Sequence, residues 1–169
     1  RLVESGPIPA PVGAMLIAEP TSNYPLVGHK GIMWIKAVSR GMTAHGSMPE
    51  KGENAIYKAA YAITTLETLA LPGGAHPTLG HPTLNVGTIA GGLNINVVPD
   101  EAVFEIDVRT TPEQNRAHVL QSLKQAVGDG IELTVFSEAA SIWTDPRHPW
   151  VQRVFDIYSR LLKGRIVFL

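Results

Sequence analysis

The sequence contains no cysteine, which excludes disulfide bonds and thiolate metal sites. This absence fits a reducing compartment, and we expect a cytoplasmic protein. No apolar run approaches the roughly 20 residues that a membrane-spanning helix needs, and the first residues lack the pattern of a signal peptide. Neither sign of charge is in excess, because 14 basic residues balance 15 acidic ones to a net charge of −1. These absences argue against a nucleic acid or a membrane as a partner.

The length of 169 residues and the hydrophobic content of 44% allow one globular domain together with part of a second. The chain begins at Arg1 rather than at a methionine. Gly164 reads as the end of a helix, and residues 166–169 have the composition of a strand that has only begun. We therefore expect the sequence to be a fragment of a longer protein.

Apolar residues recur with the two periods that distinguish strands from helices. Alternation predicts strands over residues 32–40, 84–90, 101–109 and 131–136, and helical spacing predicts helices over residues 53–71 and 112–127. Pro72 and the glycines after it end the first helix, whereas Pro112 suits the first position of the second. The order β-α-β-β-α-β predicts an α+β, ferredoxin-like fold, in which a four-stranded antiparallel sheet carries both helices on one face.

The strand over residues 101–109 has the clearest alternation. Its charged residues face one side of the sheet and its apolar residues face the other, the latter being Ala102, Phe104, Ile106 and Val108. The face without helices is therefore expected to be polar and open. Residues 28–138 hold all six elements. A short strand over residues 14–18 and a helix over residues 149–163 lie outside this unit and need something else to pack against.

Two residues stand where a side chain could reach a metal ion or a substrate. Glu19 follows the strand over residues 14–18, and a carboxylate at a strand end is well placed to bind a metal ion. Taken in isolation, Glu19 is better explained by the alternative, a charged residue that only marks the strand end. His45 lies in a loop of small residues, so it could donate a proton or a hydrogen bond to a developing oxyanion. The alternative is an ordinary surface histidine.

Asn96 and Arg109 are candidates for binding a substrate. Asn96 follows two glycines in a connection between strands, where its amide can offer both a donor and an acceptor. The alternative is an asparagine that serves a turn. Arg109 lies on the open face, and its guanidinium suits bidentate capture of a carboxylate. Here the alternative is an ion pair with Asp107 or Glu105.

Five segments occur in a specific order, namely IAEPT, GHKG, RGMTAHGSMPEKGENAI, NVGTIAGGLNINVVPD and FEIDVRTTP. In this combination the sequence resembles the M20 metallopeptidase family, whose members include acetylornithine deacetylase and succinyl-diaminopimelate desuccinylase. The resemblance covers residues 14–149. It implies a catalytic domain with two zinc ions, or cobalt or manganese in their place, interrupted by a ferredoxin-like lid that forms a homodimer. Residues 28–138 would be the lid, and residues 1–27 and 139–169 would belong to the catalytic domain.

The same resemblance implies roles for individual residues. Glu19 falls on a glutamate that binds zinc. His45 falls on the lid histidine that reaches into the partner subunit's active site and stabilises the tetrahedral intermediate. Asn96 and Arg109 fall on residues that bind the carboxylate end of a small-molecule substrate. Lys30, in a looser match, lies near a position that is often basic and faces the substrate.

The rest of the family's metal site cannot be found in this sequence. The family uses an HxD motif and two adjacent glutamates before EPT, and a histidine near its C-terminus. One glutamate cannot hold two cations. We therefore expect the lid and dimerisation domain of a zinc-dependent amidohydrolase acting on N-acyl amino acids or small peptides, inactive as a fragment. The alternative is a non-catalytic dimerisation or small-molecule-binding regulatory module, and RNA binding is least favoured because the strands lack the aromatic RNA-binding pattern.

Overall fold

The structure, a computed structural model, describes residues 12–18, 20–22 and 24–162. The chain divides into two compact units. The larger unit is Gly28–Trp143, and the smaller unit combines residues 1–27 with residues 144–169. Each unit has a hydrophobic cluster of its own.

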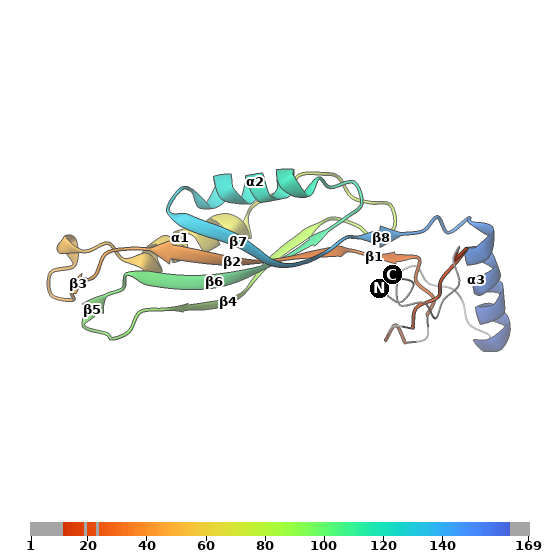
Figure 1. The fold of residues 1–169 in the computed structure, drawn as a ribbon, viewed down its shortest axis with the longest axis horizontal. Helices are drawn as coiled ribbons and strands as arrows, with labels where there is room; N and C mark the ends of the chain where they lie inside the picture. Colours follow the sequence, from red (N-terminus) through yellow and green to blue (C-terminus); the bar gives the residue numbers. More distant parts are fainter. Residues whose placement is uncertain (1–11, 19, 23, 163–169) are drawn as a thin grey trace. The chain divides into compact units, whose positions relative to one another are not determined.

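Four strands of the larger unit form one antiparallel sheet in the order β4-β6-β2-β7 (Figure 1). The strands are β2 (Gly31–Arg40), β4 (Thr83–Gly91), β6 (Glu101–Thr110) and β7 (Ile131–Ala139). β2 and β6 pair without a break from Gly31 opposite Thr110 to Arg40 opposite Glu101. This order, in which the two central strands are not consecutive in the sequence, confirms the predicted ferredoxin-like arrangement.

Helices α1 (Ala55–Glu67) and α2 (Arg116–Val127) both lie on one face of this sheet (Figure 1). Each begins after an asparagine, Asn54 or Asn115, whose side chain accepts hydrogen bonds from two backbone N–H groups. The predicted start of α2 at Pro112 is therefore wrong, because the cap at Asn115 makes Arg116 the first helical residue.

The core of the larger unit lies between the helices and the sheet. The alternation along each strand decides which side chains enter it, so the even-numbered apolar residues of β6 are buried while Glu105 is exposed. The open face is less polar than β6 alone indicates, because Trp34 and Phe136 lie on it with ring centroids 6.2 Å apart. The buried members of the core are Met33, Ile35, Ala37, Ala55, Ala59, Ala62, Leu66, Ala102, Phe104, Ile106, Val108, Val119, Leu123 and Ile131.

Two short ribbons of paired strands lie at opposite ends of the sheet (Figure 1). At one end β1 (Gly28–His29) pairs with β8 (Ile142–Trp143), so the chain enters and leaves the larger unit side by side. We call β1, β8 and residues 76–81 the junction end. At the other end β3 (Ala44–His45), which precedes the short 3-10 helix η1 (Pro49–Lys51), pairs with β5 (Val97–Val98). We call residues 41–49 and 91–99 the tip.

The described part of the smaller unit contains one helix, α3 (Pro149–Leu162). Val151 and Phe155 of this helix are buried against Val27, and the rings of Tyr24 and Tyr158 lie 6.0 Å apart. The helix is amphipathic, and its apolar face packs against Val27, outside the six-element unit, as the sequence required. Among the described residues, no helix has the length and apolarity to cross a bilayer.

Residues 12–18 form no strand, so the strand predicted over residues 14–18 is wrong. The side chains of this segment are exposed rather than buried. A strand requires a hydrogen-bonded neighbour, and no strand in the described part of the chain pairs with this segment.

Candidate functional site

His45 lies at the exposed tip, at the end of β3. The backbone N–H of Ser47 donates a 3.2 Å hydrogen bond to His45 Nδ1, and the Ser47 hydroxyl lies 2.8 Å from the same nitrogen. Because Nδ1 accepts, the hydrogen of a neutral ring is assigned to Nε2. Within the described residues Nε2 has no hydrogen-bond partner, so it can donate to an oxyanion that approaches from outside the domain.

Asn96 lies beside His45, because the Gly46 N–H donates a 2.7 Å hydrogen bond to the Asn96 carbonyl. A Cβ at position 46 would lie 2.9 Å from that oxygen, so glycine permits the close approach. The neighbouring Asn94 serves the turn, since its Oδ1 accepts a 2.8 Å hydrogen bond from the Ile95 N–H. The Asn96 amide has no partner in the part of the chain that the structure describes, and is therefore available to a ligand.

Arg109 lies on the open face of β6, near the junction end. Its Nε and Nη2 donate hydrogen bonds of 3.1 and 2.8 Å to Asp107 Oδ2. The ion pair with Asp107, which the sequence indicated as the alternative role of Arg109, is thus present. It occupies only one edge of the guanidinium, and the side chain is 41% exposed, so a second carboxylate can still approach Nη1.

Lys30 lies between β1 and β2 at the junction end. Its Nζ donates a 2.6 Å hydrogen bond to the carbonyl of His81, which ties the start of β2 to the loop before β4. An ammonium group has three hydrogens, so this bond leaves two for another acceptor. The neighbouring His29 ring donates from Nδ1 to the Lys30 carbonyl at 3.0 Å, and so acts on the backbone.

The four candidates that the structure describes fall into two groups. His45 and Asn96 lie together at the tip, which follows Arg40, the last residue of β2. Arg109 and Lys30 form the second group, and Arg109 pairs with Ile32 near the start of the same strand. The eight steps from Ile32 to Arg40 span about 26 Å at roughly 3.3 Å per residue. A substrate the size of an amino acid or dipeptide therefore cannot contact both groups within one chain.

The described residues do not fit the metal site that the resemblance implies. Glu19, the candidate metal ligand, lies outside them. Within residues 12–18, 20–22 and 24–162, no three histidine, aspartate or glutamate side chains are grouped as metal ligands. A dinuclear site needs several such ligands, so no catalytic step through a metal can be built from these residues.

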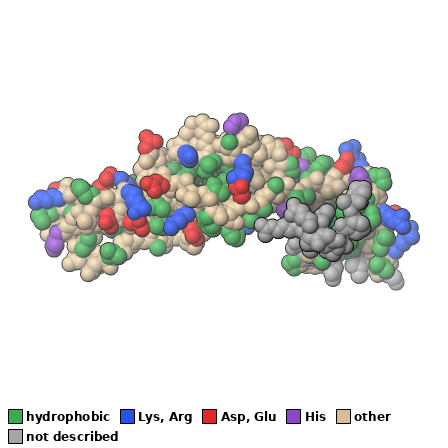
Figure 2. All heavy atoms as spheres, viewed as in Figure 1, with side chains coloured by type: hydrophobic (Ala, Val, Ile, Leu, Met, Phe, Trp, Pro, Cys, Tyr) green, Lys and Arg blue, Asp and Glu red, His purple; other side chains and the backbone are tan. Residues whose placement is uncertain are grey.

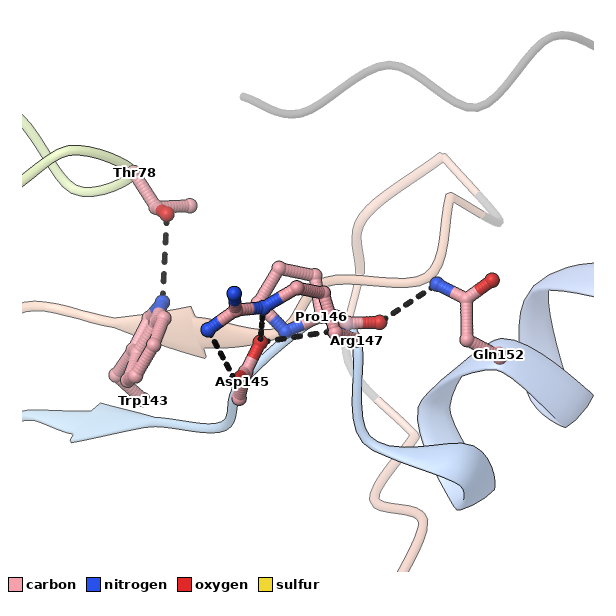
Figure 3. Close-up of polar contacts among 6 residues, drawn as sticks. All are labelled: Thr78, Trp143, Asp145, Pro146, Arg147 and Gln152. Carbon is pink, nitrogen blue, oxygen red and sulfur yellow. Dashed lines mark hydrogen bonds and ion pairs between the residues drawn. The ribbon is translucent and has the colours of Figure 1, made fainter.

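His76, at the junction end, has a role that the sequence did not indicate. It is only 5% exposed, and its Nδ1 accepts 3.1 Å hydrogen bonds from the N–H groups of Thr78 and Leu79. Its ring meets the ring of Trp143 edge-on, with centroids 5.2 Å apart, and Trp143 Nε1 donates a 3.3 Å hydrogen bond to the Thr78 hydroxyl (Figure 3). His76 therefore joins the loop before β4 to β8, although its sequence, HPTLG, signals only a turn.

Comparison with known proteins identifies the domain. The family model described as the peptidase dimerisation domain, of the M20 group, matches residues 27–132, more than half of the chain. The chain belongs to the M20 peptidase family. The matched residues of this M20 domain include Lys30, His45, Asn96 and Arg109, so both groups of candidates lie inside it.

Relatives match the chain over most of its length. A probable carboxypeptidase of Aspergillus flavus is 37% identical over 136 residues, 75% of this chain and 32% of its own. One of Aspergillus niger is 31% identical over 131 residues, 72% of this chain and 32% of its own. The chain thus spans about a third of the length of the curated relatives it matches.

Solved structures show the same fold. Aminopeptidase PepT of Bacillus cereus matches with a TM-score of 0.65 and 22% identity, over 81% of this chain and 37% of that one. An M20 family metallo-carboxypeptidase of Sulfolobus solfataricus matches with a TM-score of 0.65 and 16% identity, over 83% of this chain and 45% of that one. At these identities the likeness concerns the fold alone.

Proposed function

We propose that this chain is the lid and dimerisation domain of a metal-dependent hydrolase that cleaves the amide bond of an N-acyl amino acid or small peptide with a free carboxylate. The observation that carries the proposal is the tip, where His45 presents Nε2 beside the unengaged amide of Asn96. The carboxypeptidase names of the relatives favour cleavage next to the free carboxylate. The acetylornithine deacetylase and succinyl-diaminopimelate desuccinylase type is a narrower version of the same proposal.

His45 would act on the reacting carbonyl. Negative charge develops on the carbonyl oxygen as its carbon becomes tetrahedral, and a fixed N–H at that position stabilises the charge. The Ser47 N–H holds the ring with Nε2 available for this donation. The Asn96 amide, whose residue is hydrogen-bonded to Gly46 next to His45, would donate to the substrate's carboxylate and so set which carbonyl faces His45.

The active site would be shared between two subunits. Because about 26 Å separates the tip from Arg109, the two groups would meet only if they come from different chains. Arg109, and more loosely Lys30, would hold the substrate's carboxylate from one subunit, and His45 and Asn96 would reach it from the other. A guanidinium with one edge free binds a planar carboxylate better than the compact ammonium group of a lysine does.

The homodimer would form through β4 and α1. In the described chain β4 pairs only with β6, so its outer edge is open to another strand. Beside this edge α1 exposes two tyrosines one turn apart, Tyr57 and Tyr61, and β4 exposes Ile89. A second copy related by a two-fold axis would satisfy the edge and cover these side chains together.

The metal ions belong to the proposal for the whole enzyme. We propose zinc, with cobalt or manganese as alternatives, and Glu19 as the one ligand that this chain supplies. The chain by itself is expected to bind zinc weakly and to hydrolyse no N-acyl amino acid. Isothermal titration with zinc and an amide-hydrolysis assay test this, and robust turnover by the 169-residue chain would contradict it.

The main test uses a protein of the relatives' length that contains this chain. We expect it to hydrolyse N-acyl amino acids or dipeptides, and His45→Ala to lower kcat about 100- to 1,000-fold with a much smaller change in KM. Mixing inactive His45→Ala subunits with inactive Arg109→Ala subunits should restore activity, because some dimers then contain one intact site. A dimer without turnover would favour the non-catalytic dimerisation module instead.

A separate test addresses the dimer surface. Ile89→Lys places a charge beside the edge of β4 and is expected to convert the dimer to a monomer in sedimentation at micromolar concentration. Phe136→Lys on β7 is the matched control, because the two side chains are 55% and 53% exposed. Equal dimerisation of both variants and the wild-type protein would exclude the β4 surface.

A further inference from the structure

The tip carries two large aliphatic side chains that are almost wholly exposed. Leu93 is 97% exposed and Ile95 is 101% exposed, the highest exposures among the exposed large hydrophobic residues that the structure describes. Met48 and Val97 of the same tip are partly exposed as well. A single exposed leucine needs no explanation, but a group of apolar side chains at one place marks a contact surface.

The backbone that carries these side chains is held in place by hydrogen bonds. The Gly46 N–H binds the Asn96 carbonyl at 2.7 Å, and the Ile95 N–H binds Asn94 Oδ1 at 2.8 Å. The Val97 N–H donates to the Asn94 carbonyl at 3.3 Å. Leu93 and Ile95 are therefore presented in a fixed conformation on the ribbon that holds His45, so their exposure does not come from an unstructured loop.

The segments that surround these side chains are poor in charged residues. Residues 41–49 and 91–99, which make up the tip, contain no Asp, Glu, Lys or Arg, although such residues make up 17% of the chain. The nearest charged residues along the sequence are Glu50 and Lys51 at one side and Asp100 at the other. In Figure 2 the end of the larger unit that carries β3 and β5 in Figure 1 shows a histidine and hydrophobic side chains, with a single basic patch. Within residues 41–49 and 91–99 themselves, a ligand with a charged side chain finds no charged side chain of opposite sign to pair with.

We propose that Leu93 and Ile95 form the wall that contacts the side chain of the substrate residue bearing the free carboxylate, and that they select an aliphatic or aromatic residue there. This inference rests on the proposed function and narrows its substrate. Asn96, which would bind the carboxylate, directly follows Ile95 in the chain, so a substrate held by the Asn96 amide would lie within reach of the aliphatic pair. Substrates with a cationic or anionic side chain at this position are disfavoured, because the tip would desolvate that charge without pairing it.

The size of the selectivity follows from the burial of apolar surface on binding. One methylene in a hydrophobic pocket is worth about 10- to 200-fold in kcat/KM. A leucine side chain adds several carbons over glycine, but the tip is only one wall of the site. We therefore expect N-acetyl-leucine to be preferred over N-acetylglycine by at least about 10-fold, the lower bound for one methylene.

The experiment compares these two substrates in the protein of the relatives' length. Leu93→Asn and Ile95→Asn together keep the side-chain size close and remove the apolar surface. The double variant is expected to lower kcat/KM for N-acetyl-leucine about 10-fold or more while changing N-acetylglycine less than about 3-fold. Ile142→Asn is the matched control, since Ile142 is an exposed aliphatic residue of β8 at the junction end, and it should leave the preference unchanged.

The outcomes separate this inference from the proposed function. If the wild-type protein hydrolyses both substrates without preference, or if the double variant keeps the preference, Leu93 and Ile95 do not select the side chain and the inference is overturned while the function stands. An equal loss on both substrates shows a role in folding or in the tip's shape and also overturns it. Absence of any hydrolysis by the wild-type protein overturns the function and this inference together. The single variant Leu93→Ala, smaller and without a polar group, repeats the comparison if the double variant does not fold.

Discussion

Each end of the larger unit holds a histidine in a turn, and the ring is exposed at one end and buried at the other. At the tip, His45 is exposed and its Nε2 is unengaged within the described residues, whereas at the junction end His76 is buried beneath Trp143. In both rings Nδ1 accepts a backbone N–H from the residue two positions on. The local turn chemistry is thus the same, and the difference lies in what covers the ring. A histidine in a turn is presented for chemistry or used for stability according to its tertiary neighbours.

The largest expected effect separates these two histidines by stability. His76→Ala leaves the partly buried N–H groups of Thr78 and Leu79 without this acceptor and removes the contact with Trp143. We expect it to lower the free energy of unfolding by about 2–4 kcal/mol, whereas His45→Ala should change it by less than about 0.5 kcal/mol. Urea denaturation of the two variants measures both. Equal losses would remove the contrast between the ends.

The next effect concerns Arg109, which pairs with Asp107 and which, in the proposed function, also binds the substrate's carboxylate. Arg109→Lys keeps the charge but loses the planar fork, so we expect KM to rise about 10-fold while kcat changes little. Lys36→Arg, on the same open face, is the control and should leave KM unchanged. If Arg109→Lys lowers only the melting temperature, the pair with Asp107 is the whole role of this residue.

A smaller effect is expected from Ser47, which positions His45. Ser47→Ala removes the hydroxyl 2.8 Å from His45 Nδ1 and leaves the backbone N–H as the single local donor. We expect kcat to fall about 5-fold with KM unchanged, since one neutral hydrogen bond is worth about 1 kcal/mol. Nitrogen NMR of the imidazole should show a reduced share of the Nε2–H tautomer. Ser122→Ala, which loses only a bond to a helix carbonyl, is the control, and an unchanged tautomer ratio in Ser47→Ala would exclude the positioning role.

The smallest effect lies just beyond the junction, at Asp145. The side-chain hydrogen bond from Arg147, followed by that from the Arg147 N–H, holds the pKa of the Asp145 carboxyl below its usual value of 3.8 (Figure 3). A lowered folded-state pKa contributes stability above the unfolded value, and this is lost as the pH falls through the folded value. Both side chains face solvent, so the contribution is small. Arg147→Gln should move the Asp145 pKa upward in an NMR titration, and an unmoved pKa would rule out this pairing.

The sequence predicted the parts of the molecule that repeat with a period. The alternation around Phe104 and the helical spacing around Ala59 place both side chains in the core, where they are buried. The start of α2 was missed because Pro112 and Asn115 both suit a helix start, and hydrogen bonding decides between them. Periodicity cannot reveal the two-residue ribbon that joins His45 to Val97, because its strands are too short and lie about 50 residues apart. The sequence therefore indicated His45 and Asn96 as candidates but did not predict that they lie side by side.

The pairing of β1 with β8 has a consequence for the smaller unit. Gly28 lies opposite Trp143, and just outside this pair the Thr144 N–H donates a 2.8 Å hydrogen bond to the Val27 carbonyl. Once folded, the larger unit thus acts as a cross-link between two segments that are distant in the sequence, and it removes the loop-closure entropy that their meeting would otherwise cost. Domains whose ends meet in this way tolerate insertion and exchange. A variant in which a short turn joins residues 27 and 144 would therefore test whether the segments on either side of the M20 domain assemble without it.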